Sequence, residues 1–316
     1  MTAARNIFLT GGTGFFGKSI LSMLLRGKLS RGYRFTVLSR DPAAFLRRCP
    51  EFAGLPEVRF VSGDVRDFAF PEEEFDTVIH GAAPAVTTLA PGEMRSIITE
   101  GTQRVLEFSF RCGARTLMMI SSGGVYGVQP PELPALTEEY PCRPVTEYGI
   151  AKFDAEKRCL DSCLRQVIVP RCFAFTGPYL NRDIHFAIGN FIRDALAKLP
   201  IVVNGDGTPL RTYLYADDLV EWLFALLECG RDRLICNVGS AEAVSIAELA
   251  KIVRDELAPG GEVRVLGIPD PAKAIGRYVP SIKLAESLGL RVKVDLREAI
   301  RRSAGGSRPP LRADLA

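Results

Sequence analysis

The chain has 316 residues, 47% hydrophobic and 24% charged, which suits a globular protein of one large domain or two lobes and excludes a disordered chain. The formal net charge of +3 is small, and the lysines and arginines are scattered, which argues against a basic face for nucleic acid or for a membrane surface. No apolar run reaches the ~20 residues that cross a bilayer, and no cationic, apolar leader opens the chain.

Short apolar runs alternate with helical patterns over the first two-thirds of the chain. Strands are predicted at 7–10, 35–38, 58–61, 77–80, 117–120 and 167–169, with helices at 17–26, 93–112 and 147–164. This alternation predicts a parallel sheet, because each parallel connection needs a crossover. Strands that read as continuous apolar runs are buried on both faces. We therefore predict an α/β fold, a Rossmann doubly wound parallel sheet.

The pattern loosens after Pro170, where glycines and prolines separate shorter elements. A helix near 217–229 and a strand at 234–238 indicate a return to the main sheet. We expect a Rossmann domain of 1–174 plus about 215–240, and a smaller α/β substrate lobe of about 175–214 and 241–303. Residues 304–316 should form a flexible tail. Ligands of such folds bind beyond the carboxyl ends of the strands, hence between the two lobes.

A glycine-rich turn joins the first predicted strand to the first predicted helix, with the sequence Thr10-Gly11-Gly12-Thr13-Gly14-Phe15-Phe16-Gly17. Glycine allows a tight turn, close approach of backbone N–H groups to a pyrophosphate, and close packing of helix on strand. The start of a helix also favours an anion. The position between strand and helix predicts a dinucleotide site that includes Gly11, Gly14, Phe15, Phe16 and Gly17.

The end of the second strand bears on which dinucleotide binds. NAD sites usually place a carboxylate there for the ribose 2′-hydroxyl. Here the strand ends in Ser39 and Arg40, which suit a 2′-phosphate, and the first carboxylate is Asp41. We favour NADP(H) and keep NAD(H) as the alternative.

A phenol and an ammonium lie four residues apart in Tyr148-Gly149-Ile150-Ala151-Lys152, on one face of a predicted helix. A cation near a phenol lowers its pKa, so that Tyr148 could exchange a proton with a sugar oxygen near neutral pH. Ser122 follows another strand and could hydrogen-bond the same oxygen. Taken alone, this spacing equally fits an exposed helical pair without a role.

These segments, together with Ser121-Ser122-Gly123-Gly124-Val125-Tyr126-Gly127, resemble the extended short-chain dehydrogenase/reductase family, and within it the NAD(P)-dependent nucleotide-sugar epimerase/dehydratase branch. The resemblance runs to about residue 303. It implies that Tyr148 is the general acid/base, that Lys152 binds the nicotinamide ribose and lowers the pKa of Tyr148, and that Ser122 polarises the reacting oxygen. It also implies an adenine contact at Asp64-Val65 and a cofactor-lining turn at Ala82-Ala83.

In the substrate lobe, the resemblance implies a clamp for a nucleoside diphosphate. Asn190 and Arg211 match it, and Arg277, three residues before Pro280, resembles a second clamp arginine. Guanidinium groups pair with pyrophosphate oxygens in two-pronged fashion. By spacing alone, both arginines would be read as solvated surface charges.

The chain departs from the family pattern in three places. Family dehydratases carry an Asp-Glu pair directly after the catalytic Ser or Thr, where this chain has Gly123-Gly124, which disfavours dehydration. Ile98 stands where an asparagine usually holds a water of the proton relay. The RxxNxYGP pattern has lost its Asn and Tyr after Arg171. The substrate subgroup is therefore not a standard one.

The best prediction is a 4-ketoreductase, which transfers a hydride to the hexose ring, at C4, of a nucleoside-diphosphate sugar. Alternatives are a 4-epimerase with retained NAD, a sugar-uronate decarboxylase or dehydratase, and a non-catalytic nucleotide-sensing protein. His80 is expected to be a packed strand-end residue, and His185 could touch the sugar. The eight cysteines form no CxxC pair, which predicts reduced thiols, no metal site and a cytoplasmic location. By analogy, a homodimer through helices near 93–112 and 147–164 is expected.

Overall fold

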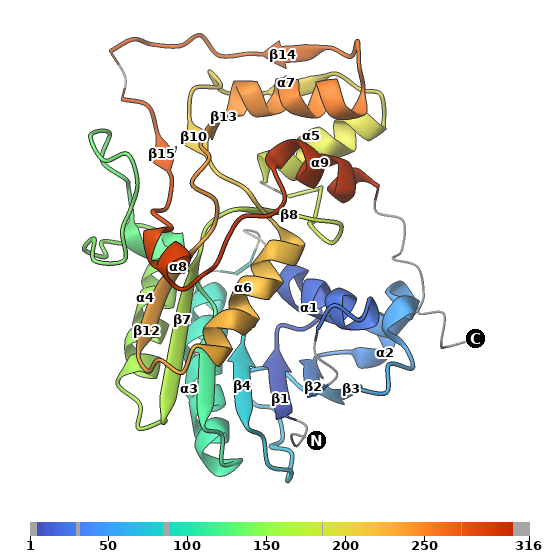
Figure 1. Ribbon diagram of the computed structural model, residues 1–316, viewed down its shortest axis with the longest axis vertical. Helices are drawn as coiled ribbons and strands as arrows, with labels where there is room; N and C mark the ends of the chain where they lie inside the picture. Colours follow the sequence, from blue (N-terminus) through green and yellow to red (C-terminus); the bar gives the residue numbers. More distant parts are fainter. Residues whose placement is uncertain are drawn as a thin grey trace.

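The larger body of the molecule is built on an eight-stranded parallel sheet (Figure 1). Seven strands have the order β12-β7-β5-β4-β1-β2-β3, and the eighth, β6, pairs with β7 after β5 has ended. The computed structural model describes residues 5–29, 32–84, 89–90, 92–184, 186–272 and 274–305. The strands are β1 (Arg5–Thr10), β2 (Tyr33–Ser39), β3 (Val58–Ser62), β4 (Thr77–His80), β5 (Thr116–Met119), β6 (Ser121–Ser122), β7 (Gln166–Cys172) and β12 (Leu234–Val238). This order confirms the predicted Rossmann fold.

Helices cover both faces of this sheet, each over its own hydrophobic core. One core joins the sheet to α1 (Phe15–Leu25), α2 (Pro42–Arg48) and α6 (Ala216–Glu228). The opposite core joins it to α3 (Glu93–Arg111) and α4 (Glu147–Leu160). Short 3-10 helices are η1 (Pro50–Phe52) and η2 (Gly123–Tyr126). With both faces covered, the central strands are buried, as their continuous apolar runs predict.

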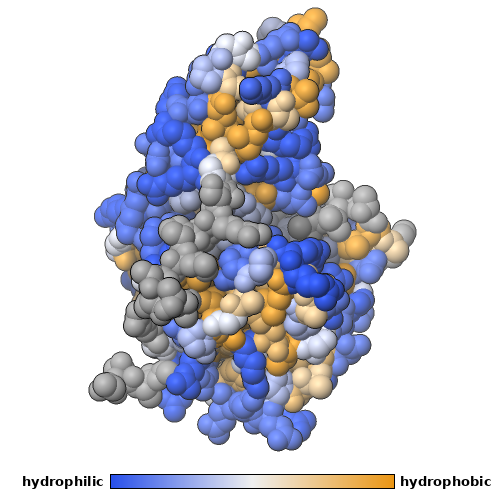
Figure 2. Space-filling model, turned by 90° about the vertical axis from the view of Figure 1, so that its right-hand side faces the viewer, coloured by the Kyte–Doolittle hydropathy of each residue, from blue (hydrophilic) through white to orange (hydrophobic). Residues whose placement is uncertain are grey.

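A smaller body lies above the carboxyl ends of the sheet and has a core of its own (Figure 1). It contains α5 (Ala187–Leu196), α7 (Ile246–Leu257) and α9 (Leu296–Ala304), with β9 (Ile201–Val203) parallel to β14 (Val263–Val265). Two small sheets run below it, β13-β10-β15 and β11-β8. Their strands are β10 (Leu210–Arg211), β13 (Val244–Ser245), β15 (Arg277–Tyr278), β8 (Phe175–Thr176) and β11 (Leu214–Tyr215). The two bodies appear in Figure 2 as a wide lower part and a narrower upper part.

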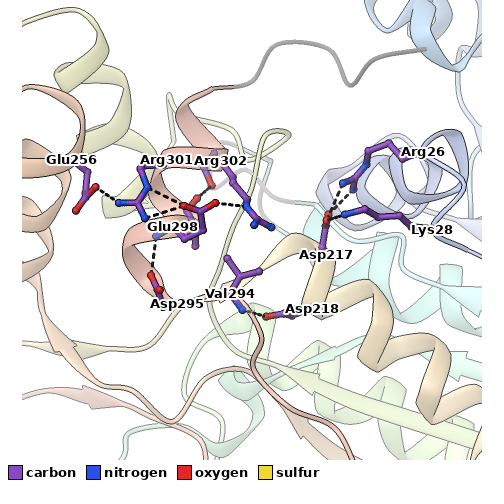
Figure 3. A network of polar contacts seen from close by, with 12 residues as sticks. Arg26, Lys28, Asp217, Asp218, Glu256, Val294, Asp295, Glu298, Arg301 and Arg302 are labelled. Atoms are coloured by element: carbon purple, nitrogen blue, oxygen red, sulfur yellow. Dashed lines mark hydrogen bonds and ion pairs between the residues drawn. The ribbon is translucent and has the colours of Figure 1, made fainter. Parts of the chain in front are cut away.

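Polar contacts join the two bodies where α6 meets the chain that leads into α9 (Figure 3). Asp217, at the start of α6, accepts hydrogen bonds from Arg26 at 2.5 and 2.9 Å and from Lys28 at 3.0 Å. Asp218 accepts the backbone N–H groups of Lys293 and Val294 at 2.9 and 3.0 Å. Consecutive carboxylates thus fix α6 to α1 on one side and to the approach of α9 on the other.

Several predicted boundaries need correction. The strand predicted to end at Val169 continues through Pro170 to Cys172, and Pro170 lies between Ile168, the last residue that pairs with β5, and Arg171, which pairs with β6. A proline is tolerated at such a break in the ladder. Helix α9 reaches Ala304, inside the expected tail, and residues 306–316 lie outside the described residues. The short helix α8 (Lys283–Ser287) packs on β12, and its Ala285 belongs to the core of the larger body.

Candidate active site

The glycine-rich turn between β1 and α1 is shaped by close backbone contacts. Gly11 has a φ of +75°, and a Cβ there would lie 2.5 Å from the carbonyl of Gly81. A Cβ on Gly17 would lie 2.1 Å from Gly12, so only glycine lets α1 approach the turn. At Gly14, by contrast, a Cβ would meet only the carbonyl oxygen of Gly11, at 3.4 Å. Gly14 is the N-cap residue of α1 and has no side chain with which to cap the helix. Among the described residues no side chain caps the start of α1, which fits the pyrophosphate of a dinucleotide.

Phe15 and Phe16, in the first turn of α1, form an aromatic group with Phe175 of β8. Their rings meet edge to face at 5.7 Å, and Phe175 lies 5.4 Å from Phe16 and 6.3 Å from Phe15. Strand β8 follows β7 and pairs with β11 outside the large sheet. These rings therefore pack the start of α1 against the chain that connects the two bodies.

The ends of β2 and β3 present the groups expected near the adenosine. Ser39 is buried and Arg40 is exposed, and Arg40 makes no ion pair with any described residue. Asp41 points elsewhere, since its carboxylate accepts the N–H of Ala44 at 2.8 Å and caps α2. Asp64 is held by Arg66 through side-chain contacts of 2.8 and 3.0 Å, and these hydrogen bonds keep the pKa of Asp64 below its usual value.

Val65 and the turn after β4 line the same edge of the sheet. Val65 packs on α3, where a Cβ on Gly101 would lie 2.8 Å from it. Ala82 donates its N–H to the hydroxyl of Thr10 at 3.2 Å, and Ala83 packs beside it against the α3 core. The structure thus brings the expected dinucleotide residues to one edge of the sheet, from β1, β2, β3 and β4.

His80 is a packed, hydrogen-bonded strand-end residue, as predicted. Its Nδ1 lies 2.8 Å from the hydroxyl of Thr10, and its Nε2 lies 3.0 Å from that of Thr102. The Thr102 hydroxyl donates to the carbonyl of Ile98 at 2.6 Å, so it must accept from Nε2, and Nδ1 accepts from Thr10. Burial lowers the pKa of His80 to about 3, which keeps the ring neutral. Ile98 itself is buried in the α3 core and offers only its carbonyl.

Ser122, Tyr148 and Lys152 come together at the carboxyl ends of β5 and β7. Thr146 caps α4 by accepting the N–H of Gly149 at 3.1 Å, which sets Tyr148 in the first turn. The Ser122 hydroxyl accepts the N–H of Gly124 at 3.1 Å, and a Cβ on Gly124 would lie 3.3 Å from that hydroxyl and 4.0 Å from the ring of Tyr148. Lys152 is buried and donates to the carbonyl of Ile120 at 2.9 Å.

Burial sets the direction of the pKa shifts of Tyr148 and Lys152. Burial raises the pKa of Tyr148 to about 12, while the hydrogen bond from Ser122 acts in the opposite direction. The ammonium of Lys152 donates to Ile120 in this structure, so the expected effect of Lys152 on the pKa of Tyr148 stays a prediction for the cofactor-bound protein. Burial also lowers the pKa of Lys152 to about 8.

A fourth side chain, Tyr278 of β15, reaches this group and was missed by the sequence reasoning. Its hydroxyl lies close to the turn after Ser122, since a Cβ on Gly123 would lie 2.7 Å from it, and its ring packs at a tilt on Phe173 with the ring centroids 4.7 Å apart. Burial raises the pKa of Tyr278, with Ser122 again opposing. The only sequence signal was its place beside Arg277, a residue already singled out. Nothing in the spacing indicated that this strand runs beside the carboxyl end of β6.

The expected clamp residues lie in the smaller body. Leu210 pairs with Arg277, and Arg211 with Tyr278, across the parallel strands β10 and β15. The guanidinium of Arg211 lies 6.0 Å from the ring of Tyr278. Three buried polar atoms of this body have no hydrogen-bond partner among the described residues: Asn190 Oδ1, Thr212 Oγ1 and Arg277 Nε. Unpartnered buried polar groups are rare, and a bound polar ligand is one way to satisfy them. His185 lies outside the described residues.

A buried ion pair supports the site from below. Arg171 of β7 donates to both carboxylate oxygens of Glu156 on α4, at 2.8, 3.1 and 3.2 Å, and Ser121 donates to the same carboxylate. The two side chains are 4% and 1% exposed. Since Ser121 precedes Ser122, this pair fixes the strand that carries the Ser122 hydroxyl.

Other classes of site are not seen in the part of the chain that the structure describes. All eight cysteines are free thiols, and no three His, Cys, Asp or Glu side chains gather as metal ligands among the described residues. No described helix combines the length and apolar character that a membrane span requires.

Comparison with known proteins gives one family. The model of the NAD dependent epimerase/dehydratase family matches residues 7–239. UDP-glucuronic acid decarboxylase 1 of Xenopus tropicalis is 29% identical over 95% of this chain and 71% of its own length. A putative UDP-glucose 4-epimerase of Methanocaldococcus jannaschii is 27% identical over 94% of this chain and 96% of its own length.

Solved structures show the same fold. A UDP-N-acetylglucosamine 4-epimerase of Methanobrevibacter ruminantium superimposes with a TM-score of 0.83 at 20% identity, covering 96% of this chain and 98% of that one. A UDP-glucuronic acid 4-epimerase of Bacillus cereus, solved with UDP-glucuronic acid and NAD, gives 0.82 at 22% identity, with the same coverage.

Proposed function

The chain belongs to the NAD-dependent epimerase/dehydratase family, and on that premise we propose that it transfers a hydride at ring carbon C4 of a nucleoside-diphosphate hexose. The observation that carries the proposal is the meeting of Ser122, Tyr148 and Lys152 at the edge of the sheet where α1 begins without a side-chain cap. The pyrophosphate of a dinucleotide fits the first turn of α1. Proton transfer to or from a sugar oxygen fits the hydroxyl groups of Ser122 and Tyr148.

Each residue then has a chemical task. The bound nicotinamide supplies or accepts the hydride. Tyr148 exchanges a proton with the sugar oxygen at C4, and Ser122 hydrogen-bonds the same oxygen. Lys152 contributes its ammonium to the nicotinamide ribose and, once turned from Ile120 toward that ribose, favours the phenolate of Tyr148. Asn190, Arg211 and Arg277 bind the nucleoside diphosphate, which would give Asn190 Oδ1 and Arg277 Nε the partners they lack.

We propose NADP(H) as the preferred cofactor, with NAD(H) as the alternative. Arg40 is exposed and without an ion pair among the described residues, and Asp41, the nearest carboxylate in sequence, is engaged as the cap of α2. A guanidinium at this place suits a 2′-phosphate. The dissociation constants of NADP+ and NAD+, measured by calorimetry for the wild type and for Arg40→Ala, test this. Arg40→Ala should weaken NADP+ by about tenfold and leave NAD+ unchanged.

For the net reaction we propose reduction of a 4-keto sugar. Gly123 and Gly124 bring no carboxylate to the sugar, which argues against dehydration. A 4-epimerase is the second candidate, because several of the similar proteins bear that name. Decarboxylation of a sugar uronate, the activity in the name of the Xenopus relative, is the third.

One experiment tests the site and separates these reactions. The purified protein is analysed by mass for bound dinucleotide, then assayed on nucleotide hexoses, uronates and 4-keto sugars, with and without added NADPH. A reductase consumes NADPH once per product, whereas turnover without added cofactor, by a protein that retains NAD, would establish the epimerase. Tyr148→Phe should lose about 100-fold or more of the activity, since positioned acid/base groups contribute that much. Unchanged turnover in Tyr148→Phe would refute the proposed site.

Two wider expectations remain proposals. The first is the division into 1–174 plus about 215–240 for the dinucleotide and about 175–214 with 241–303 for the sugar nucleotide, within which the segment of α8 packs on the larger body. We also keep a homodimer through α3 and α4. Their outer surface carries charged side chains, among them Glu100, Arg104 and Arg158, so such a contact would be polar. Light scattering of the purified protein decides the oligomeric state.

A further inference from the structure

Two buried amide side chains, Asn237 and Gln129, lie where the segment after β15 meets the larger body. Asn237, near the end of β12, is 0% exposed, and Gln129, in the loop after η2, is 3% exposed. The proposed function uses neither of them. Both contact the backbone just after Arg277 and Tyr278, so they bear on where these two residues are placed.

The side chain of Asn237 joins three segments of the chain. Its Oδ1 accepts the hydroxyl of Tyr126 at 2.7 Å, and its Nδ2 donates to the carbonyls of Leu136 at 2.9 Å and Ser281 at 3.2 Å. These partners leave one orientation for the amide, because only its nitrogen can donate to two carbonyls. Tyr126 belongs to η2, the turn that follows Ser122. One side chain therefore ties this turn to the segment after β15.

The segment after β15 is held by backbone hydrogen bonds as well as by the two amides. Gln129 Oε1 accepts the N–H of Val279 at 2.8 Å, and Gln129 Nε2 donates to the carbonyl of Leu133 at 2.9 Å. Leu136 donates its N–H to the carbonyl of Val279 at 2.9 Å and accepts the N–H of Ser281 at 2.7 Å. The segment 279–281 thus runs along Leu136 as a parallel bridge, with an amide side chain bonded at each end.

Arg277 is thereby fixed from two directions. On the side of the smaller body, Arg277 pairs with Leu210 of β10, and Leu210 donates its N–H to the carbonyl of Gly276 at 2.8 Å. On the side of the larger body, the amides hold the residues two and four positions further along the chain. A shift of this segment would move Arg277, and a misplacement of about 1 Å is enough to weaken a positioned contact.

We propose that Asn237, together with Gln129, is a positioning residue that sets Arg277 at the distance from the catalytic group that one nucleoside-diphosphate sugar spans. The inference rests on the proposed function, in which Arg277 binds the diphosphate and Ser122 hydrogen-bonds the sugar oxygen. The amide is required because it offers two N–H groups and an acceptor in one short side chain. A carboxylate accepts from Tyr126 but has no N–H for the two carbonyls, and a protonated carboxyl donates to one of them at most.

The first test is the affinity of the protein for UDP, dTDP, GDP and CDP, and for the dinucleotide that it binds, measured by calorimetry. Asn237→Asp should raise the dissociation constant of the bound nucleoside diphosphate about tenfold and leave that of the dinucleotide unchanged. With the most active nucleotide hexose, KM should rise by a similar factor and kcat should fall less, because the carboxylate still accepts from Tyr126. In an Arg277→Met background Asn237→Asp should cause no further loss, because the effect passes through Arg277.

Gln166→Glu is the matched control. Gln166 of β7 makes the same kinds of contact at the opposite end of the sheet, where its Oε1 accepts the hydroxyl of Thr116 at 2.8 Å and its Nε2 donates to the carbonyl of Arg231 at 3.0 Å. This variant should leave both affinities unchanged. An equal loss in Gln166→Glu would mean that any broken amide contact lowers the affinity, and it would overturn the inference.

A second variant covers the case in which Asn237→Asp does not fold. Gln129→Met removes the acceptor of the Val279 N–H and leaves the contacts of Asn237 in place. The affinity for the nucleoside diphosphate should fall about threefold, because the segment loses one of its two amides. Gln129→Met then takes the place of Asn237→Asp in both measurements.

A second readout does not depend on a bound ligand. Hydrogen exchange followed by mass spectrometry reports the backbone N–H groups of Val279 and Ser281. In Asn237→Asp the peptide that covers 276–282 should exchange about tenfold faster, whereas the peptide that covers the glycine-rich turn should not change. If the wild type binds no nucleoside diphosphate, the proposed function fails, and the exchange still tests the inference. The role of Asn237 is overturned by an unchanged diphosphate affinity or, where no diphosphate binds, by an unchanged exchange rate.

Discussion

The ion pair beneath the catalytic group and the ion pairs along α9 differ chiefly in their exposure to water. Glu156 and Arg171 are 1% and 4% exposed. In the smaller body, Glu256 and Glu298 pair with Arg297, Arg301 and Arg302, whose side chains are 44–53% exposed (Figure 3). Both groups have short contacts, so distance alone does not rank them.

Exposure to water predicts which of these ion pairs contributes more to stability. A buried charge that loses its partner keeps its desolvation penalty, whereas an exposed charge is returned to water and is screened by salt. The buried pair also reaches the site, since Ser121 donates to Glu156 and pairs with Arg171 across β6 and β7. We therefore expect the first pair to affect both stability and activity, and the second to affect only stability, and weakly.

The largest effect is expected for Glu156→Gln. The amide keeps the size of the side chain but leaves the Arg171 guanidinium buried without a counter-charge, which should cost about 3–5 kcal/mol of unfolding free energy. The free energy is measured by urea unfolding at neutral pH. Activity should fall as well, because Ser121 loses the carboxylate that fixes the strand leading to Ser122.

The double variant Glu156→Leu with Arg171→Met is the control for this prediction. It removes both charges and replaces them with apolar groups of similar size, so it should be less destabilised than Glu156→Gln. If the double variant proves less stable than Glu156→Gln, the carboxylate of Glu156 stabilises the fold through its other contacts and not through the guanidinium of Arg171.

Asp217 should give an intermediate effect, because its side chain is 10% exposed and that of Arg26 is 22% exposed. Asp217→Asn keeps an acceptor for Arg26 and Lys28 but removes the charge. We expect a loss of about 2 kcal/mol, between the values for exposed and buried pairs. Urea unfolding in parallel with Glu156→Gln measures the difference, and an equal loss in both variants would contradict the ranking by exposure.

The pH dependence of stability tests Asp217 independently. Burial raises the pKa of Asp217, but hydrogen bonds from Arg26 and Lys28 outweigh it and hold the pKa below the usual value. The stability that this carboxylate contributes is present above its unfolded pKa of about 3.9 and is lost as the pH falls through the folded pKa. Unfolding free energies measured from neutral pH to about pH 3 should fall less steeply in Asp217→Asn than in the wild type. Burial raises the pKa of Asp218, so Asp218→Asn should make the fall steeper.

The larger body could be predicted from the sequence because its signals are local. Strands 77–80 and 234–238 have the observed bounds, and the glycine-rich turn, Tyr148 and Lys152 stand in short motifs beside them. In the smaller body, the prediction gave only shorter elements where α5, α7 and α9 form. A capping box of Ser245 and Glu248 does mark the start of α7 and could have been used.

Tyr278 could not have been found in this way. Its position depends on β15 pairing with β10 and on a bridge from Leu136 to Pro280, contacts between segments far apart in the chain. A two-residue strand has no periodicity to detect. The long-range pairing that places the phenol beside Ser122 is a property of the tertiary structure.

The smallest effect is expected for Glu298→Gln. Glu298 pairs with Arg301 at 2.9 Å and with Arg302 at 2.7 Å, and these contacts lower its pKa, yet both arginines stay largely in water and regain hydration when the charge is removed. Asp295 still caps α9 in the variant. The urea midpoint should therefore move less than in Asp217→Asn, and high salt should remove the remaining difference from the wild type, because salt screens exposed pairs and not the buried one. Should the midpoint of Glu298→Gln stay as low in high salt as in low salt, the pair would be acting as a buried one, and exposure would not be what separates the two regions.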